Sequence, residues 1–222
     1  MMKIIRSFFR KKTLINAIPR YIIFIILNLR YLKKYNTLNG SFYLPFFAFQ
    51  DVIRNTIIKN KIYEEEVYNA VKKKIKPNSI VLDIGSNYGQ MSILWSKVKQ
   101  GVQVYSFEAS SYIFTILKKN IEINNANVKA FNNIVGNVSD KLAYISKSKL
   151  DKYTSYGSNK LELTKKKKNS DKIECIKIDD IAFNQNISVM KIDVQGFDLH
   201  VLKGAKETIK KYEMPIIFEY DK

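Results

Sequence analysis

The chain has 222 residues, of which 46% are hydrophobic, so it is long enough to bury a full core without disulfides or a structural metal. A single cysteine and a single histidine exclude a disulfide framework, a multi-cysteine zinc site and a histidine-rich metal centre, and we expect no bound metal. The net charge of +18 is typical of proteins that bind nucleic acid or anionic lipid. Lysine, isoleucine, asparagine and tyrosine are abundant along the whole chain, however, so part of this charge reflects general residue usage.

Residues 1–60 are expected to form a basic, aromatic-rich and mainly helical extension. Nine lysines and arginines precede the first acid, Asp51. The apolar run Tyr21–Leu29 is much shorter than the roughly 20 residues that span a bilayer. Two interpretations remain open: residues 1–36 lie on anionic lipid as interfacial helices, or the extension packs on the domain that follows. We expect a cytoplasmic protein, with peripheral membrane contact under the first interpretation. The aromatic run Phe42–Phe49 is expected to cover an apolar surface as a short strand or loop.

Residues 61–222 alternate between apolar runs and amphipathic segments and are expected to form one domain. Strands are predicted at 79–84, 102–107, 128–135, 173–178, 188–194 and 215–219, and helices at 63–74, 91–98, 112–123 and 199–211. Short apolar strands separated by helices of this kind are typical of parallel βαβ units with right-handed crossovers. We therefore predict an α/β fold with a doubly wound, mostly parallel sheet. The polar stretch 147–172 is expected to be either a lid or a solvated loop.

The loop after the first core strand reads Asp83-Ile84-Gly85-Ser86-Asn87-Tyr88-Gly89. In open α/β sheets, ligands bind outside the carboxyl ends of the strands, so this loop is the first candidate for a binding site. Its spacing differs from the G-x-G-x-x-G of dinucleotide sites and suits a ligand that carries both a carboxylate and an amine. Backbone N–H groups would meet the carboxylate and Asp83 the ammonium. The alternative is a plain turn that contains glycine.

Glu108 ends the second core strand, 25 residues after Asp83. A carboxylate there can accept hydrogen bonds from both hydroxyls of a ribose. An isolated glutamate at a strand end is usually only solvated, but its pairing with Asp83 favours the ribose interpretation. The two loops together describe a nucleoside with an amino-acid tail, and S-adenosylmethionine is such a molecule.

Lys191 and Asp193 lie in a later apolar strand, and a period of two residues places both side chains on one face near its carboxyl end. A charged pair inside an apolar strand is costly to bury unless the partners meet or serve a site. The pair is therefore either part of a methyl-acceptor site or a structural ion pair. Glu219, at the end of the last predicted strand, is expected to add a further carboxylate at the same edge of the sheet.

Five segments in order, VLDIGSNYGQMS, YSFEAS, NNIVGNVSD, VMKIDVQGFDLHVLKGA and PIIFE, resemble the FkbM-type methyltransferase family. This family is a branch of the Rossmann-like class I S-adenosylmethionine-dependent enzymes, and the resemblance covers about residues 60–220. It implies that S-adenosylmethionine is the cofactor. The residues it assigns to cofactor binding are Asp83, Gly85, Ser86, Asn87 and Gly89 for the methionine end, Glu108 for the ribose, and Asn133 and Ile134 for the adenine.

The resemblance further implies transfer of a methyl group to a hydroxyl of a sugar, glycan, glycolipid or related natural product. Asp193 is then the expected base, with Lys191 or Glu219 orienting the acceptor. We do not expect a nucleic-acid acceptor, because no strand end or sheet face typical of such enzymes is visible. The single His200 lies in the helix predicted at 199–211, between Leu199 and Val201, and is not expected to be catalytic.

Two features depart from the family pattern. Gln195 stands where the family usually has a glutamate, and the chain ends three residues after Glu219, where the fold usually adds a C-terminal strand pair. The last strand would then present an open edge, so we expect either that the chain is a fragment or shortened gene product, or that the aromatic run Phe42–Phe49 covers this edge. Two alternatives to the enzyme therefore remain: a catalytically silent protein with the cofactor fold, and a nucleic-acid methyltransferase or binder.

Overall fold

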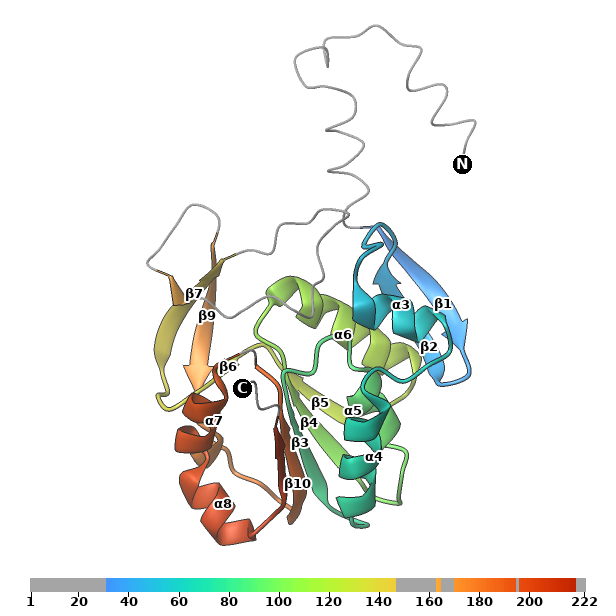
Figure 1. Ribbon diagram of the computed structural model, residues 1–222. Helices are drawn as coiled ribbons and strands as arrows, with labels where there is room; N and C mark the ends of the chain where they lie inside the picture. Colours follow the sequence, from blue (N-terminus) through green and yellow to red (C-terminus); the bar gives the residue numbers. More distant parts are fainter. Residues whose placement is uncertain (1–30, 147–162, 165–169, 195, 219–222) are drawn as a thin grey trace, which may run out of the picture.

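The computed structural model describes residues 31–146, 163–164, 170–194 and 196–218 (Figure 1). Its strands are β1 (Leu32–Thr37), β2 (Gly40–Pro45), β3 (Ile80–Ile84), β4 (Gln103–Phe107), β5 (Val128–Phe131), β6 (Ile134–Val135), β7 (Lys141–Ser146), β8 (Leu163–Thr164), β9 (Ser170–Ile176), β10 (Ile187–Ile192) and β11 (Ile216–Phe218). Its helices are α3 (Val52–Ile58), α4 (Glu65–Lys74), α5 (Gln90–Trp95), α6 (Ser111–Ile123), α7 (Asp198–Gly204), α8 (Lys206–Tyr212) and a 3₁₀ turn at Ile178–Asp180.

The central sheet has five parallel strands in the order β11-β10-β3-β4-β5, which confirms the predicted doubly wound α/β fold. Alternate residues of each buried strand face opposite layers. Leu82 and Met190 pack against α7 and α8, whereas Val81 and Val189 pack against α4 and α5. This register also places Lys191 opposite Asp83.

A second sheet, in the order β6-β9-β7-β8, differs from the expected elements. The single strand predicted at 128–135 is wrong: β5 ends at Phe131, and β6 pairs in parallel with β9 instead. The chain leaves the central sheet at Asn132, whose Nδ2 donates to the backbone oxygens of Glu108 and Ala109 at 2.8 and 3.1 Å. The predicted polar loop at 147–172 is also too long, because its last residues belong to β9, which pairs antiparallel with β7. Residues 147–162 and 165–169 lie outside the described residues.

The helix predicted at 199–211 is two helices, α7 and α8, separated at Ala205. Gly204 lies so close to the carbonyl oxygen of Gly136 that a Cβ there would clash with it. The carboxylate of Asp179 accepts hydrogen bonds from the first-turn N–H groups of α8, including that of Thr208 at 2.8 Å. A cap supplied from a distant turn, which periodicity does not reveal, therefore starts a new helix here.

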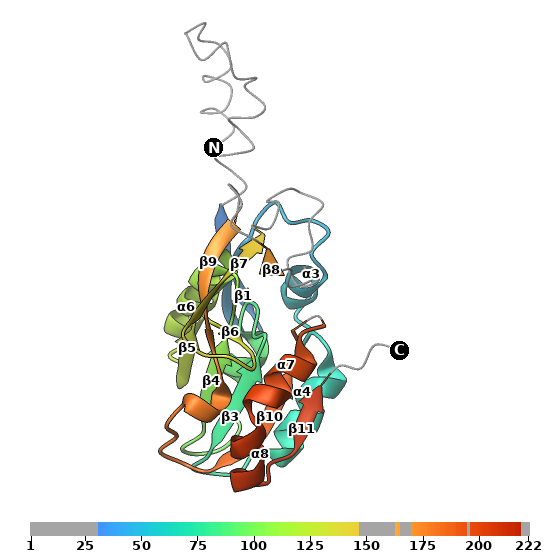
Figure 2. The same cartoon turned by 90° about the vertical axis from the view of Figure 1, so that its left-hand side faces the viewer.

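The described part of the 1–60 segment is a β-hairpin followed by α3, rather than a mainly helical extension, and residues 1–30 lie outside the described residues. Phe42 and Leu44 of β2 are buried against Ile113 and Ile116 of α6. The aromatic run therefore covers an apolar surface as expected, but this surface is α6 and not the edge at β11. Figure 2 shows α6 and β11 at opposite edges of the central sheet. Among the described helices, none has the length and apolar character needed to cross a bilayer.

Candidate functional site

The loop between β3 and α5 is bent by residues in the left-handed region. Gly85, Asn87 and Gly89 have φ values of +82°, +49° and +83°. A Cβ at Gly85 would clash with the carbonyl oxygen of Asp193, so only glycine allows the end of β3 to approach β10 this closely. Gly85 therefore has a steric role in joining the ends of β3 and β10.

The backbone N–H groups of this loop donate within the protein, which differs from the expected cradle of free donors. Those of Gly85 and Ser86 donate to the carbonyl oxygen of Phe107 at 2.9 and 3.1 Å. The remaining N–H groups, of Asn87, Tyr88 and Gly89, donate to Glu108 Oε2, Asn87 Oδ1 and the Ser86 carbonyl oxygen. The loop is therefore held in one conformation by the end of β4.

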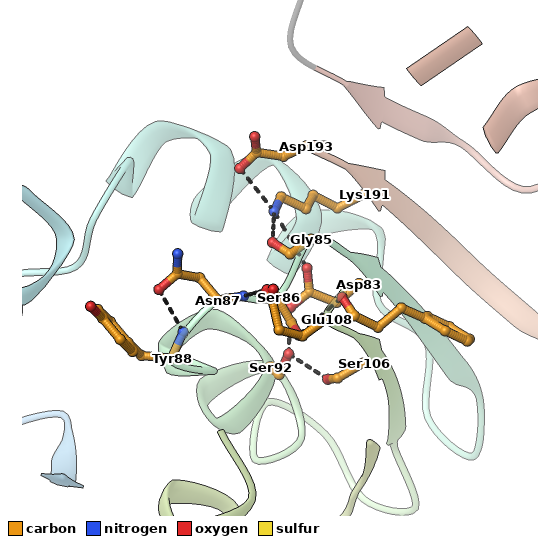
Figure 3. A network of polar contacts seen from close by, with 11 residues as sticks. Asp83, Gly85, Ser86, Asn87, Tyr88, Ser92, Ser106, Glu108, Lys191 and Asp193 are labelled. Carbon is orange, nitrogen blue, oxygen red and sulfur yellow. Dashed lines mark hydrogen bonds and ion pairs between the residues drawn. The ribbon is translucent and has the colours of Figure 1, made fainter. Parts of the chain in front are cut away.

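Glu108 closes this loop from the end of β4 (Figure 3). Its Oε2 accepts from the Asn87 N–H at 3.0 Å and its Oε1 from the Ser110 N–H at 2.8 Å. Burial raises the pKa of the carboxyl to about 7, although these two N–H groups and the charge of Lys191 act in the opposite direction. Each carboxylate oxygen keeps a second lone pair, so the group retains the capacity to accept from two hydroxyls.

Lys191 is buried and joins the ends of β3 and β10 (Figure 3). Its Nζ lies 3.1 Å from Asp193 Oδ2, 3.5 Å from Asp83 Oδ1 and 3.0 Å from the carbonyl oxygen of Gly85. Burial lowers the pKa of Lys191, but the two carboxylates outweigh it and hold this pKa above its ordinary value. Lys191 and Asp193 meet as the period of two predicted, and the structure adds Asp83 to the pair.

Asp83 lies deeper than its sequence position indicated, at 1% exposed. Its Oδ2 accepts a short hydrogen bond from the Ser92 hydroxyl of α5, which in turn accepts from Ser106 of β4 at 2.7 Å. Its Oδ1 has Lys191 nearby as a charge but no hydrogen-bond donor. The ammonium that the sequence led us to expect beside Asp83 is thus supplied, in this structure, by the protein's own lysine.

Two further contacts tie the loop of residues 85–89, called the cofactor loop below for its proposed role, to the hairpin segment, and sequence reasoning missed both. The Tyr88 hydroxyl donates to Asp51 Oδ2 at 2.9 Å, and both residues are fully buried. Asn120 of α6 donates to the carbonyl oxygens of Tyr88 and Tyr43 and accepts from the Tyr43 N–H at 2.6 Å. The only signal in the sequence was a polar residue, Asn120, on the apolar face of a helix.

The remaining predicted residues are spread around this centre. Asn133 donates to the carbonyl oxygen of Glu174 at 3.3 Å, and Ile134 is buried in a small cluster with Cys175. His200 stacks on Phe197, with ring centroids 4.3 Å apart, and its Nδ1 lies 3.2 Å from Asn137 Oδ1. Gln195 and Glu219 lie outside the described residues. Nowhere in the described ranges do three His, Cys, Asp or Glu side chains gather as metal ligands would.

The carboxylate of Glu108 fits the ribose of S-adenosylmethionine, because it lies half-buried at the strand end with capacity to accept from vicinal hydroxyls. The oxygens of Asp83, Gly85 and Asp193 surround the ammonium of Lys191, so in this structure they are occupied by the protein's own cation. A parallel sheet with these groups at adjacent strand ends is a Rossmann-like α/β arrangement, in which ligands bind outside the carboxyl ends of the strands.

Residues 83–222 match the family model described as the methyltransferase FkbM domain, and the chain belongs to this family. S-adenosylmethionine is accordingly the cofactor. No curated protein sequence matches the chain.

Among solved structures, the chain is similar to a precorrin-6y C5,15-methyltransferase from Geobacter metallireducens, at 13% identity and a TM-score of 0.40, covering 66% of this chain and 58% of that one. It is also similar to a Pyrococcus abyssi tRNA (uracil-54, C5)-methyltransferase in complex with S-adenosyl-L-homocysteine, at 12% identity and a TM-score of 0.45. That match covers 84% of this chain and 33% of the other. The chain thus spans about a third to somewhat over half of these two proteins.

Proposed function

We propose that the protein is an S-adenosylmethionine-dependent O-methyltransferase that acts on a hydroxyl of a sugar, glycan or related natural product. The observation that carries the cofactor part is the Glu108 carboxylate, which lies at the end of β4 and is bonded to the glycine loop after β3. The acceptor part is supported by membership of the FkbM family and by the charged residues at the end of β10.

In this proposal the loop after β3 holds the methionine end of the cofactor and Glu108 holds the ribose. Asn133 and Ile134, which follow β5, flank the adenine. Asp83 is buried beneath this loop, and its carboxylate holds Lys191 in place through their ion pair. In this proposal the pair of Asp83 and Lys191 limits the movement of the loop. When bound, S-adenosylmethionine supplies an electrophilic methyl group on its sulfonium.

Asp193 is the proposed base for the acceptor hydroxyl. Its carboxylate is 24% exposed, whereas the Lys191 side chain that pairs with it is 6% exposed. A proton acceptor must be reachable by the substrate, and Asp193 is the more accessible partner. Lys191 holds this carboxylate in place, so we propose it as the residue that orients the base, with Glu219 as a further group on the acceptor side.

We propose a small-molecule, glycan or glycolipid acceptor and no nucleic-acid partner. Contact of residues 1–36 with a membrane surface and a cytoplasmic location belong to the same proposal. Support for lipid contact comes from the nine cations that precede the first acid in the chain.

Calorimetry with S-adenosylmethionine tests the cofactor site first. Glu108→Ala is expected to weaken binding, whereas Glu122→Ala, which removes an exposed carboxylate from α6, is the matched control and should bind as the parent does. Equal binding by both variants would contradict the ribose assignment. No binding by the parent protein would remove the enzyme proposal altogether.

Transfer of a labelled methyl group to a panel of glycans, glycolipids and nucleic acids then tests the acceptor. We expect label on a glycan hydroxyl, and Asp193→Asn to lower the rate while cofactor binding is kept. Label on nucleic acid instead would refute the acceptor class. Cofactor binding without transfer to any acceptor would favour the catalytically silent alternative.

A further inference from the structure

The hairpin of β1 and β2 lies beside α3 (Figure 1). A partly exposed aromatic cluster lies where its strands begin and end. We call it the aromatic patch, and it consists of Tyr31, Phe46, Phe47, Phe49 and Val52. Phe46 contacts Tyr31, Phe47 and Phe49 edge to face, with ring centroids 5.8, 4.7 and 6.4 Å apart. Tyr31, Phe49 and Val52 are 45%, 53% and 57% exposed. Exposed apolar side chains that gather in one place usually mark an interaction surface.

Lysines at the start of β1 lie beside the aromatic patch. Lys33 and Lys34 are both exposed, and Lys33 Nζ lies 5.5 Å from the Phe46 ring. Asp51, the one acid between residues 31 and 63, is 0% exposed and accepts the hydroxyl of Tyr88, so its charge does not reach this surface. The surface therefore combines aromatic rings with the positive charge of these two lysines.

We propose that the aromatic patch docks the protein on an anionic lipid bilayer. Aromatic rings favour the headgroup region of a membrane, and lysines near an anionic surface each strengthen attachment. The patch lies at the end of a hairpin with exposed Lys33 and Lys34 beside it, and these charges complement a negatively charged surface. The sequence that enters the patch at Tyr31 is itself cationic and apolar, with no acid in residues 1–30.

Docking would also place the cofactor loop near the lipid surface. Asp51 lies between Phe49 and Val52 in the chain, and it bonds directly to Tyr88 of that loop. This inference deepens the membrane contact proposed above for residues 1–36, because it names the folded surface that meets the lipid, and it holds whether or not a glycan is the acceptor.

Co-sedimentation of the full chain with vesicles tests the proposal. We expect binding to vesicles of phosphatidylglycerol and phosphatidylcholine and much weaker binding to phosphatidylcholine alone. The double variant Phe49→Ser/Val52→Ser is expected to lower the partition coefficient about tenfold or more, because two apolar side chains no longer enter the bilayer. Lys33→Glu/Lys34→Glu should lower it by at least about fivefold per lysine at low salt.

Leu38→Ser is the matched control for the apolar substitutions. Leu38 is 89% exposed, but it lies in the hairpin turn, about 20 Å along the strands from the aromatic patch. Its loss should leave vesicle binding unchanged. Equal binding by parent and Phe49→Ser/Val52→Ser, or an equal loss in Leu38→Ser, would overturn the proposal. Calorimetry with S-adenosylmethionine on the same variants separates a failure of lipid docking from a failure of the cofactor site.

Discussion

Tyr88→Phe removes a single hydroxyl from the tie between the cofactor loop and the hairpin segment. The hydroxyl donates to Asp51 Oδ2 at 2.9 Å, and neither residue is exposed. A hydrogen bond to a buried charged group contributes about 1.5 to 3 kcal/mol. We therefore expect the free energy of unfolding to fall by about 2 kcal/mol, since the phenyl ring still fills the same space.

The same change should weaken S-adenosylmethionine binding, because Tyr88 lies in the loop that is proposed to hold the methionine end. Urea denaturation measures the stability change, and calorimetry measures cofactor affinity. Tyr43→Phe is the control: its contacts with Asn120 are made by its backbone, and its ring lies under Lys119, so all of them survive. An unchanged stability in Tyr88→Phe would refute the importance of this bond. A stability loss with unchanged cofactor affinity would show that the hairpin does not govern the loop.

Three further changes probe the site itself. Lys191→Met should lower the free energy of unfolding, measured by urea denaturation, by about 3 to 5 kcal/mol, because Asp83 at 1% exposure loses its cation. The double variant Lys191→Met/Asp83→Asn should recover part of this lost stability. S-adenosylmethionine affinity, measured by calorimetry, should rise with pH up to about 7 and then level off. The reason is that the raised pKa of Glu108 leaves its carboxyl neutral below that pH. Glu108→Gln should remove this pH dependence. Gly85→Ala should abolish cofactor binding and lower the melting temperature far more than Gly196→Ala, which has a similar φ of +87° but no atom within 4 Å of the added Cβ.

The pH prediction has an opposite sign for folding. Glu108 has a pKa of about 7 in the folded protein and an ordinary value of 4.5. Between these two values the folded state holds a proton that the unfolded chain has released, so the contribution of this group to stability falls as pH rises through that window. The rise in pH that strengthens cofactor binding through Glu108 therefore lowers the contribution of this group to the stability of the free protein.

Local patterns were sufficient for the central sheet and for part of the site. Strands β3, β4 and β10 are buried on both faces, and such strands can be recognised in a sequence as continuous apolar runs. Lys191 and Asp193 were placed together by the period of two alone. The split of residues 128–135 between two sheets could not be predicted from the sequence pattern. It occurs where the Asn132 side chain bonds to the backbone after β4, which is distant in the chain.

The sequence by itself determined the α/β class, the glycine loop and the presence of acids at the strand ends. Only the tertiary structure decided how these acids are neutralised. Asp83 and Lys191 are 108 positions apart in the chain, and they meet because β3 and β10 are neighbours in the sheet. The tie between Asp51 and Tyr88 likewise depends on the hairpin packing against α6. Contacts of this kind follow from strand order and helix packing, which local periodicity does not specify.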